Sequence, residues 1–492
     1  YANVASAQTV ANNALGDLAL VPYYTVNGEW LTGIHIVNTS ADTQVVKFRF
    51  RRAPDSMDAL DFNIVMSPYD VYAGYLSDDE NGVISWQADD TTCTVPATTG
   101  GKLTMPEIYR EDAETGYVEI IAMGSPISET GPIATAAKHK AGTPLDCAAV
   151  RSNFFADGSV TGQVRGVDTN ALTYQDGAGT DLDGANEYED SGDVLKVSYF
   201  IRDNASGIEF GDNAVHIQGF LTQPSITNQQ YGWFSGDLDG FDFPDLDGGV
   251  PTASPAERGR FDALRQGDVL GVASLINEWT ANSANGAALD WVVTMPGQYT
   301  MLNLPGYVAD LLSDDEADDC LRGEADGEIA CDNRDIPVQA SIAPFNREEG
   351  TLTDPEGDLV VSPAPPGEVQ RLILPKETNV VTFGGNSVLG VSDVDITADL
   401  DQPYGWLALA VSSAQSYLGG ATAICDWTDV DTTDQDDGGY NAAAGAALTM
   451  SCSDATGNVP MIGFAAWARQ VAANPDASYG RIVAHSFGSA PE

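Results

Sequence analysis

The sequence has few basic residues and few histidines. Its 492 residues include 72 acidic against 22 basic side chains, which gives a formal net charge of −50, and only four histidines. A surface of this charge repels nucleic acid, anionic lipid and acidic substrates, so these partners are excluded. Three explanations of the acidic excess stay open: a saline habitat, loops that bind calcium, and a basic partner.

The chain also lacks the usual signatures of a membrane span and of several enzyme classes. No run of about 18 apolar residues occurs, which excludes a membrane-spanning helix. No glycine-rich phosphate loop follows a predicted strand, and no CxxC pair indicates a zinc or redox site. The segment AHSFG at residues 484–488 resembles a nucleophile elbow. In that fold the acid and the histidine follow the serine, and this sequence leaves no room for them. We therefore expect no enzymatic activity.

Six cysteines form an even set of sequence-local neighbours, which favours disulfides in an oxidising compartment. Of the pairings that six cysteines allow, we favour those that stay within one module: Cys93–Cys147, Cys320–Cys331 and Cys425–Cys452. The first residues, YANVASAQTVANNALGDLALVPYY, have no basic region followed by an apolar one. They are typical of a mature N-terminus whose export signal has been removed. We expect an extracellular or cell-surface protein.

Alternation of apolar and polar residues predicts strands along most of the chain. An apolar content of 43% allows large cores. The clearest predicted strands are EWLTGIHIVNTS, TQVVKFRFRRA, ALDFNIVMSPYD, GYVEIIAMGS, VLKVSYFIRD and NAVHIQGFLTQ. Helical periodicity is rare; we expect a few short helices, the clearest at residues 255–266 and a second at 463–474. Many strands separated by turn-rich gaps predict an all-β fold of two to three tandem immunoglobulin-like β-sandwiches with long acidic loops.

Two echoes within the chain suggest repeated modules. ALDFNIVMSP at residues 59–68 is similar to ALDWVVTMP at 288–296, and QQYGWFS from Gln229 is similar to QPYGWLALAV from Gln402. Equivalent strands in stacked sandwiches would explain both echoes. Composition then suggests the following division: an N-terminal segment 1–22, sandwiches at 23–170, 194–310 and 336–492, an acidic linker at 171–193 and an acidic loop at 311–335.

Three segments, VPYYTVNGEWLTGIHIVNTS, SMDALDFNIVMSPYDVYAG and LINEWTANSANGAALDWVVTMP, resemble parts of large secreted β-rich proteins of Gram-negative bacteria. That group has no assigned activity. The resemblance implies export and a β-rich body, and it implies no reaction.

Crowded carboxylates predict structural calcium sites. The segment GDLDGFDFPDLDGG at residues 236–249 does not match an EF-hand at either end, yet Ca²⁺ accepts six to eight oxygens from irregular loops. Five carboxylates so close together repel one another strongly without a cation. Solvated acidic loops are the alternative. The predicted ligands are Asp237, Asp239, Asp242, Asp245 and Asp247, then Asp181, Asp183, Asn186 and Glu187, and finally Asp429, Asp431, Asp434 and Asp436.

The first twenty residues carry the functional hypothesis. They are small, uncharged before Asp17 and free of proline. Such a segment can add a strand to an open sheet edge of a neighbouring copy, with Tyr1, Val4 and Val10 as contacts, and head-to-tail addition builds open filaments. A frayed segment, or one docked within its own chain, is the alternative. We expect a structural subunit of a filament or surface layer, a self-assembling homopolymer. The alternatives are a monomeric adhesin that binds glycans and, third, a secreted hydrolase.

Overall fold

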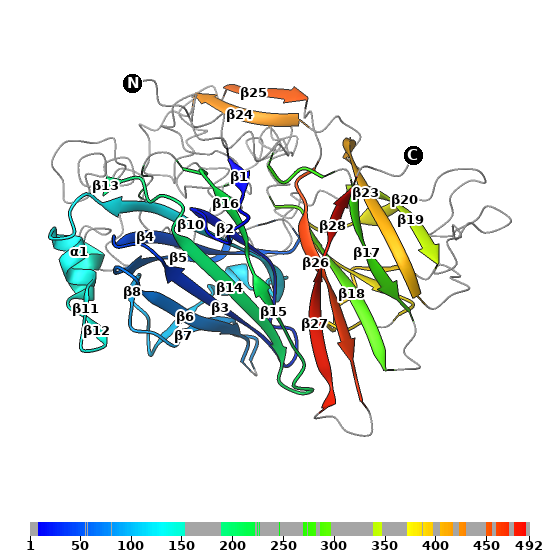
Figure 1. The fold of residues 1–492 in the computed structure, drawn as a ribbon, viewed down its shortest axis with the longest axis horizontal. Helices are drawn as coiled ribbons and strands as arrows, with labels where there is room; N and C mark the ends of the chain where they lie inside the picture. The colour runs from blue at the N-terminus through cyan, green and yellow to red at the C-terminus, as the bar shows by residue number, and fades with distance from the viewer. Residues whose placement is uncertain are drawn as a thin grey trace.

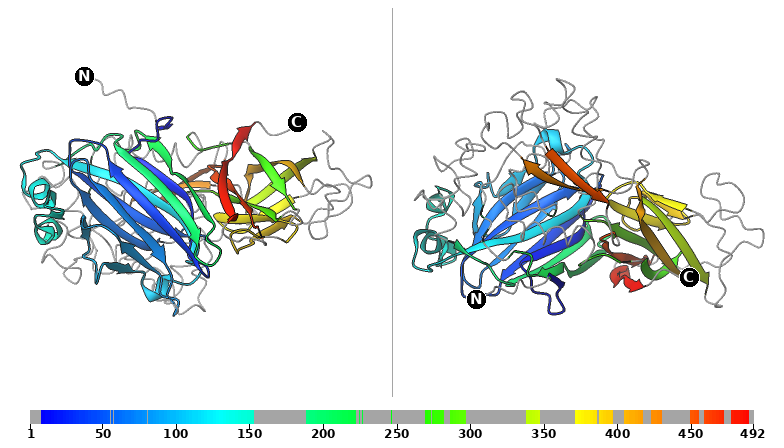
Figure 2. Two further views of the ribbon diagram at one scale, coloured as in Figure 1. Left: turned by 60° about the horizontal axis from the view of Figure 1, so that its bottom comes forward. Right: turned by 90° about the horizontal axis from the view of Figure 1, so that it is seen from above.

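The fold of a computed structural model consists of antiparallel sheets packed face to face (Figures 1 and 2). The structure describes residues 8–54, 56, 58–79, 81–152, 188–221, 224, 226, 246, 269–272, 274–281, 286–296, 338–346, 371–385, 387–396, 404–416, 423–429, 449–454, 459–471 and 477–488. The predicted all-β class is confirmed, with most of the described strands in two sandwich-like bodies that lie side by side.

The first sandwich has sheets of eight and six strands. The larger sheet has the order β1 (Thr9–Val10), β16 (Val215–Gln218), β2 (Leu18–Thr25), β10 (Thr115–Pro126), β4 (Gln44–Arg52), β5 (Asp58–Met66) and β8 (Cys93–Val95), with β13 (Tyr188–Glu189) paired to β10. The smaller sheet has the order β15 (Glu209–Asn213), β14 (Leu195–Asp203), β3 (Trp30–Asn38), β6 (Val71–Ser77), β7 (Ser85–Ala88) and β9 (Lys102–Thr104).

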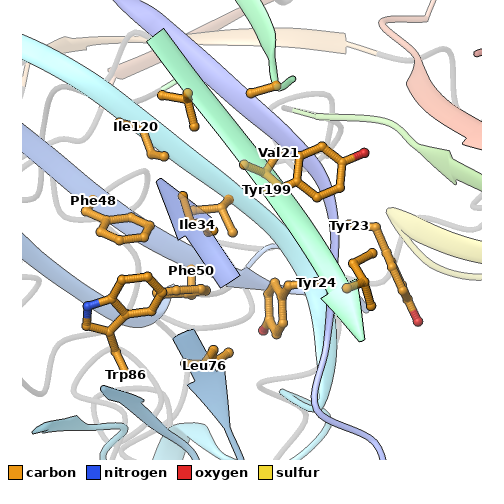
Figure 3. Packing of buried hydrophobic residues seen from close by; sticks show 14 of the residues in the cluster. Val21, Tyr23, Tyr24, Ile34, Phe48, Phe50, Leu76, Trp86, Ile120 and Tyr199 are labelled. Atoms are coloured by element: carbon orange, nitrogen blue, oxygen red, sulfur yellow. The ribbon is translucent and has the colours of Figure 1, made fainter. Parts of the chain in front are cut away.

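The core of the first sandwich is rich in aromatic side chains that come from both sheets (Figure 3). Phe48 of β4 lies with its ring centroid 4.9 Å from that of Trp86 of β7, in an edge-on arrangement. The Trp86 indole N–H donates to the Tyr72 hydroxyl at 2.8 Å, so the buried polar atom of this tryptophan has a partner. Contacts of this kind require the alternation that the sequence shows in both strands.

The second sandwich has two sheets of five strands. One has the order β20 (Arg371–Leu374), β19 (Val338–Asn346), β23 (Tyr404–Ser416), β17 (Ser274–Thr280) and β28 (Ser486–Gly488). The other has the order β22 (Val394–Ile396), β21 (Thr378–Phe383), β18 (Ala287–Thr294), β26 (Ile462–Arg469) and β27 (Tyr479–Ala484), with β21 and β22 parallel. A separate ribbon pairs β24 (Ala423–Asp429) with β25 (Thr449–Asp454).

The two sandwiches share a buried junction because β18 and β26 are apolar on both faces. In β18, Trp291 and Val293 face the core of the second sandwich, whereas Val292 packs into the core of the first. In β26, Phe464 lies against Tyr199 of β14 with ring centroids 6.3 Å apart. This two-sided burial joins the bodies through apolar contacts.

The predicted division at 23–170, 194–310 and 336–492 is wrong in the structure. Strand β14 pairs with β3 over nine residues and β16 pairs with β2, so residues 195–218 complete the first sandwich. Strands β17 and β18 pair with β23 and β26, so these two strands belong to the second. The boundary after residue 22 also falls inside β2. Pairing between distant segments, which local composition does not reveal, sets these boundaries.

The helix predicted at residues 463–474 is also wrong, because β26 occupies most of it. Its alternating residues face two different cores, and this arrangement requires a strand. The helix predicted at 255–266 lies outside the described residues. The described helices are α1 (Pro132–Ala137), α2 (Cys147–Ser152) and the 3₁₀ turn η1 (Glu107–Tyr109), beside a small hairpin of β11 (His139–Lys140) and β12 (Thr143–Pro144). No helix in the described ranges is long and apolar enough to cross a membrane.

Several strands predicted from the alternating pattern are present. EWLTGIHIVNTS contains β3, TQVVKFRFRRA contains β4, and VLKVSYFIRD contains β14. The ALDFNIVMSP echo lies in β5 of the first sandwich, and ALDWVVTMP lies in β18 of the second. The segment QPYGWLALAV contains the start of β23, whereas QQYGWFS lies outside the described residues.

Candidate functional site at the junction of the two sandwiches

A cavity of about 500 Å³ lies where the edge of the first sandwich meets the second. Its lining comes from β1 and the following turn, from β14 to β16, and from β26 to β28. Apolar cavities of this size with a few polar groups are typical ligand sites. We call it the junction cavity.

His216 forms part of the wall on the first sandwich. Its Nε2 accepts a hydrogen bond from the Val197 backbone N–H at 2.8 Å, so the neutral ring carries its proton on Nδ1. Burial lowers the pKa of His216 to about 4. The ring is therefore uncharged at neutral pH, and its position in β16 is fixed by β14.

His485 forms part of the wall on the second sandwich. Its Nε2 lies 3.0 Å from the carbonyl oxygen of Val292, which can only accept, so Nε2 donates and carries the proton. Its Nδ1 then accepts from the Asn277 side-chain N–H at 3.0 Å. Burial lowers the pKa of this ring to about 4 as well. Both ring nitrogens are used inside the protein, so His485 presents only its apolar surface to the cavity.

Gly463 is required beside His485. A Cβ at this position would lie 2.0 Å from the Val292 carbonyl oxygen and 3.4 Å from the His485 ring, and the backbone φ is +151°. Only glycine therefore lets β26 pass close to this carbonyl.

The N-terminal strand β1 forms one rim of the cavity. It pairs with its neighbour β16 at two positions, Thr9 opposite Gln218 and Val10 opposite Ile217. The Ala11 N–H adds a bond to the His216 carbonyl at 2.8 Å. Val10 is 49% exposed, and Phe487, which also lines the cavity, is 59% exposed. The attachment of β1 therefore consists mainly of a few backbone hydrogen bonds.

The chain after β1 is held much more firmly. Gly16 exchanges two backbone hydrogen bonds with Leu195, at 3.0 and 3.1 Å. The buried carboxylate of Asp17 accepts from the backbone N–H groups of Phe220 and Leu221 at 2.9 and 2.6 Å. Burial, with a smaller effect of the negative charge of Asp193, raises the pKa of Asp17 to about 8. Position 16 is therefore a fixed point, and the segment before it is only lightly attached.

A second polar cluster lies on the face of the eight-stranded sheet that is turned away from the core of the first sandwich. Lys47, Arg49 and Arg51 of β4 are all fully buried. The Lys47 ammonium lies 3.0 Å from Asp61, and the two arginines share the carboxylate of Glu119 at 3.1 and 2.7 Å. The alternation in TQVVKFRFRRA indicates a solvent-facing side for these cations, and the structure instead covers it. Buried ion pairs of this kind fix strand register at a high desolvation cost, so we assign the cluster a structural role.

A third cluster joins His139 to Ser67 and Asp70. The Ser67 Oγ lies 3.1 Å from the His139 Nδ1, and a carboxylate oxygen of Asp70 lies 3.6 Å from the same nitrogen. In a catalytic triad the acid and the nucleophile occupy opposite ring nitrogens. Here both face one nitrogen, while Thr91 lies 3.4 Å from Nε2. The arrangement attaches the β11–β12 hairpin to the sandwich and provides no relay.

The remaining predicted residues fall mostly outside the described residues. Of the predicted calcium ligands, only Asp429 lies within them, at the end of β24. No group of three or more potential metal-ligating side chains occurs among the residues that the structure describes. Tyr1 and Val4 also lie outside, and Val10 is in β1. The calcium sites therefore stay a prediction.

The Cys93–Cys147 disulfide is present, linking β8 to α2 across a sequence separation of 54. Backbone pairing places Cys425 directly opposite Cys452 in the β24–β25 ribbon. Cys320 and Cys331 lie outside the described residues. One of the three predicted pairs is thus confirmed. The other two stay predictions.

No local sequence pattern indicates the junction cavity. His485 and Asn277 are 208 residues apart, and His216 belongs to the other sandwich. No protein-family model, curated protein or solved structure matches the chain. The described fold defines an all-β protein of two packed sandwiches whose N-terminal strand lies on a sheet edge beside an apolar cavity.

Proposed function

We propose that the protein is an extracellular structural subunit that polymerises by exchanging its N-terminal strand. The observation that carries the proposal is the position of β1. It lies at the outer end of the eight-stranded sheet, paired with β16 by a few backbone bonds and with Val10 half exposed. A strand at such an edge can be replaced by the same strand of another copy with the same hydrogen bonds.

The exchange of β1 between two copies costs little free energy. Each bond that β1 loses within its own chain is regained in the neighbour, so the swap itself costs little, and domain swapping is a low-cost route to association. Gly16 and the buried Asp17 hold the chain just after β1, so the strand can leave without loosening β2. Because donor and acceptor surfaces differ, the contact is head-to-tail and the assembly is an open filament.

Charge also supports the donor segment. Two copies that each carry a net charge of −50 repel one another over most of their surfaces. The sixteen residues before Asp17 carry no charged side chain. An uncharged strand therefore approaches a second copy with little repulsion. Calcium at the acidic loops would reduce the remaining repulsion and is part of the proposal as a structural cofactor.

Electron microscopy of the purified protein tests the assembly. Fibres or sheets are expected at high protein concentration with calcium present, and isolated particles alone under these conditions would contradict the proposal. Deletion of residues 1–14 should abolish fibres while the folded body keeps its circular dichroism spectrum. Unchanged fibres from this deletion variant would exclude strand exchange.

A competing peptide provides a sharper control. A synthetic peptide of residues 1–14 should cap growing ends and shorten the fibres. The same peptide with Val10→Lys should be inactive, because it brings a charge to the rim of an apolar cavity. Equal effects of both peptides would show that pairing at β16 is not involved.

An exposed aromatic stack supports the second candidate, a surface adhesin that binds glycans. Trp406 of β23 is 41% exposed and stacks on Phe345 of β19, with ring centroids 3.9 Å apart and an interplanar angle of 8°. A flat, exposed indole suits stacking against a sugar ring. Under this reading the monomer is retained on a glycan array and Trp406→Ala abolishes retention. Equal retention of both proteins would exclude this platform.

A further inference from the structure

The junction cavity is larger than the gaps that ordinary packing leaves. Protein interiors hold few voids larger than a water molecule. An engineered cavity of roughly 150 Å³ binds benzene, so about 500 Å³ has room for about 20 non-hydrogen atoms. The space is therefore large enough for a small organic molecule.

The chemistry of the lining selects against anionic ligands. Apolar side chains dominate the wall, among them Tyr199, Leu270, Met461 and Phe464. The lining that the structure describes contains no lysine or arginine, and its one carboxylate is Asp212. An anion would meet no cation here and would enter against the field of a strongly acidic protein.

The two histidines do not change this conclusion. The ring nitrogens of His485 bond to Asn277 and Val292, and the Nε2 of His216 bonds to Val197. Both rings therefore act as fixed, uncharged wall elements. The exposed polar side chains in the lining are Asn12, on the turn after β1, and Asp212 and Asn213 of β15.

We propose that the junction cavity is a binding site for an uncharged, mostly apolar molecule of about 20 non-hydrogen atoms. Its apolar body would fill the space between β14 and β26, and a hydroxyl or an uncharged arylamine N–H at one end would lie against Asp212 and Asn213. This proposal does not depend on strand exchange, because the cavity is complete within one chain.

Two fluorescent probes that share one skeleton test the size and charge requirements. N-phenyl-1-naphthylamine is neutral and fits the estimated size, and 8-anilino-1-naphthalenesulfonate adds a sulfonate to the same skeleton. Titration of the full-length monomeric protein should give saturable binding of the neutral probe at one site, with a dissociation constant on the order of 1–100 µM. The anionic probe should bind at least tenfold more weakly.

Two variants assign the binding to this cavity. Ala214 lines the cavity and is buried, so Ala214→Phe should fill part of the space and weaken the neutral probe at least tenfold. Ala205→Phe adds the same side chain on an exposed turn outside the cavity and should leave binding unchanged. Asp212→Lys changes an exposed position at the mouth and should increase the affinity for the anionic probe.

Each result of these titrations either supports or overturns the proposed binding site. Selective binding that Ala214→Phe weakens and Ala205→Phe does not would support the site. Equal affinity for both probes, or binding that neither Ala214→Phe nor Asp212→Lys alters, would overturn it, as would no saturable binding of the neutral probe. If Ala214→Phe does not fold, the affinities of the two probes for Asp212→Lys decide the question alone.

Discussion

Replacement of Asp290 by asparagine should remove much of the pH dependence of stability at the junction of the sandwiches. Asp290 lies in β18 and is completely buried. One of its carboxylate oxygens accepts three hydrogen bonds, from the Ser387 hydroxyl at 3.0 Å and from the backbone N–H groups of Val388 and Leu389 at 2.7 and 2.8 Å. These bonds hold the loop that carries Leu389 into the core of the first sandwich.

Burial raises the pKa of Asp290 from 3.8 to about 7, although the three hydrogen bonds act in the opposite direction. The folded protein therefore keeps a proton that the unfolded chain releases above pH 4. Stability from this group is complete below pH 4 and is lost as the pH rises to about 7. At 1.36 kcal/mol per pH unit, three units correspond to a loss of about 4 kcal/mol in the free energy of unfolding.

Urea denaturation at intervals from pH 4 to pH 8 measures this effect. The difference between wild type and Asp290→Asn should change by several kcal/mol over the range, in favour of the variant at higher pH, because the amide cannot ionise. Ser387→Ala is the control, since it removes one hydrogen bond and keeps the carboxyl group. A constant difference between wild type and Asp290→Asn at every pH would refute the reasoning.

Three further predictions concern other buried groups. Burial lowers the pKa of His485 to about 4, so the stability it contributes is present above pH 6.5 and falls by about 3 kcal/mol as the pH drops to 4; His485→Gln should flatten the acid side of the denaturation curve. Glu119→Gln leaves the two buried arginines of β4 without their shared negative charge and should lower the free energy of unfolding by about 3–5 kcal/mol. The control Glu209→Gln, at an exposed ion pair, should lower it by less than about 1 kcal/mol. Equal urea midpoints for the two variants would contradict this prediction. Reduction of Cys93–Cys147, or Cys93→Ser, releases a loop with a sequence separation of 54 and should cost about 4 kcal/mol; an unchanged midpoint under reducing conditions would count against it.

Local alternation of apolar and polar residues was sufficient to find those strands that have one buried face and one more exposed face. In VLKVSYFIRD, buried and half-buried residues alternate along β14 as the sequence indicates. The same rule is less informative for β4, where the alternating cations are as buried as the phenylalanines. Which face of a strand meets water depends on what covers the sheet, and this is absent from the strand's own sequence.

The helix predicted at 463–474 shows a related limit. A run of alanines with Trp467 fits helical periodicity, yet β26 lies between two cores and needs apolar residues on both faces. A strand buried on both sides carries no alternation, so its pattern cannot be distinguished from a short buried helix. The division into modules was wrong because β3 pairs with β14 across more than 150 residues, and local sequence does not reveal such pairing.

The sequence by itself determined the all-β class, the acidic surface, one disulfide pair and the uncharged N-terminal segment, because each depends on composition or on neighbouring residues. Only the tertiary structure decided which strands complete each sandwich, where β1 lies and how His216 and His485 come to line one cavity. Antiparallel sheets join segments that are far apart in the chain, and their edges and junctions exist only after that pairing is made. The acidic surface and the uncharged N-terminal strand could therefore be predicted from the sequence, whereas the pairing of β1 with β16 and the cavity could not.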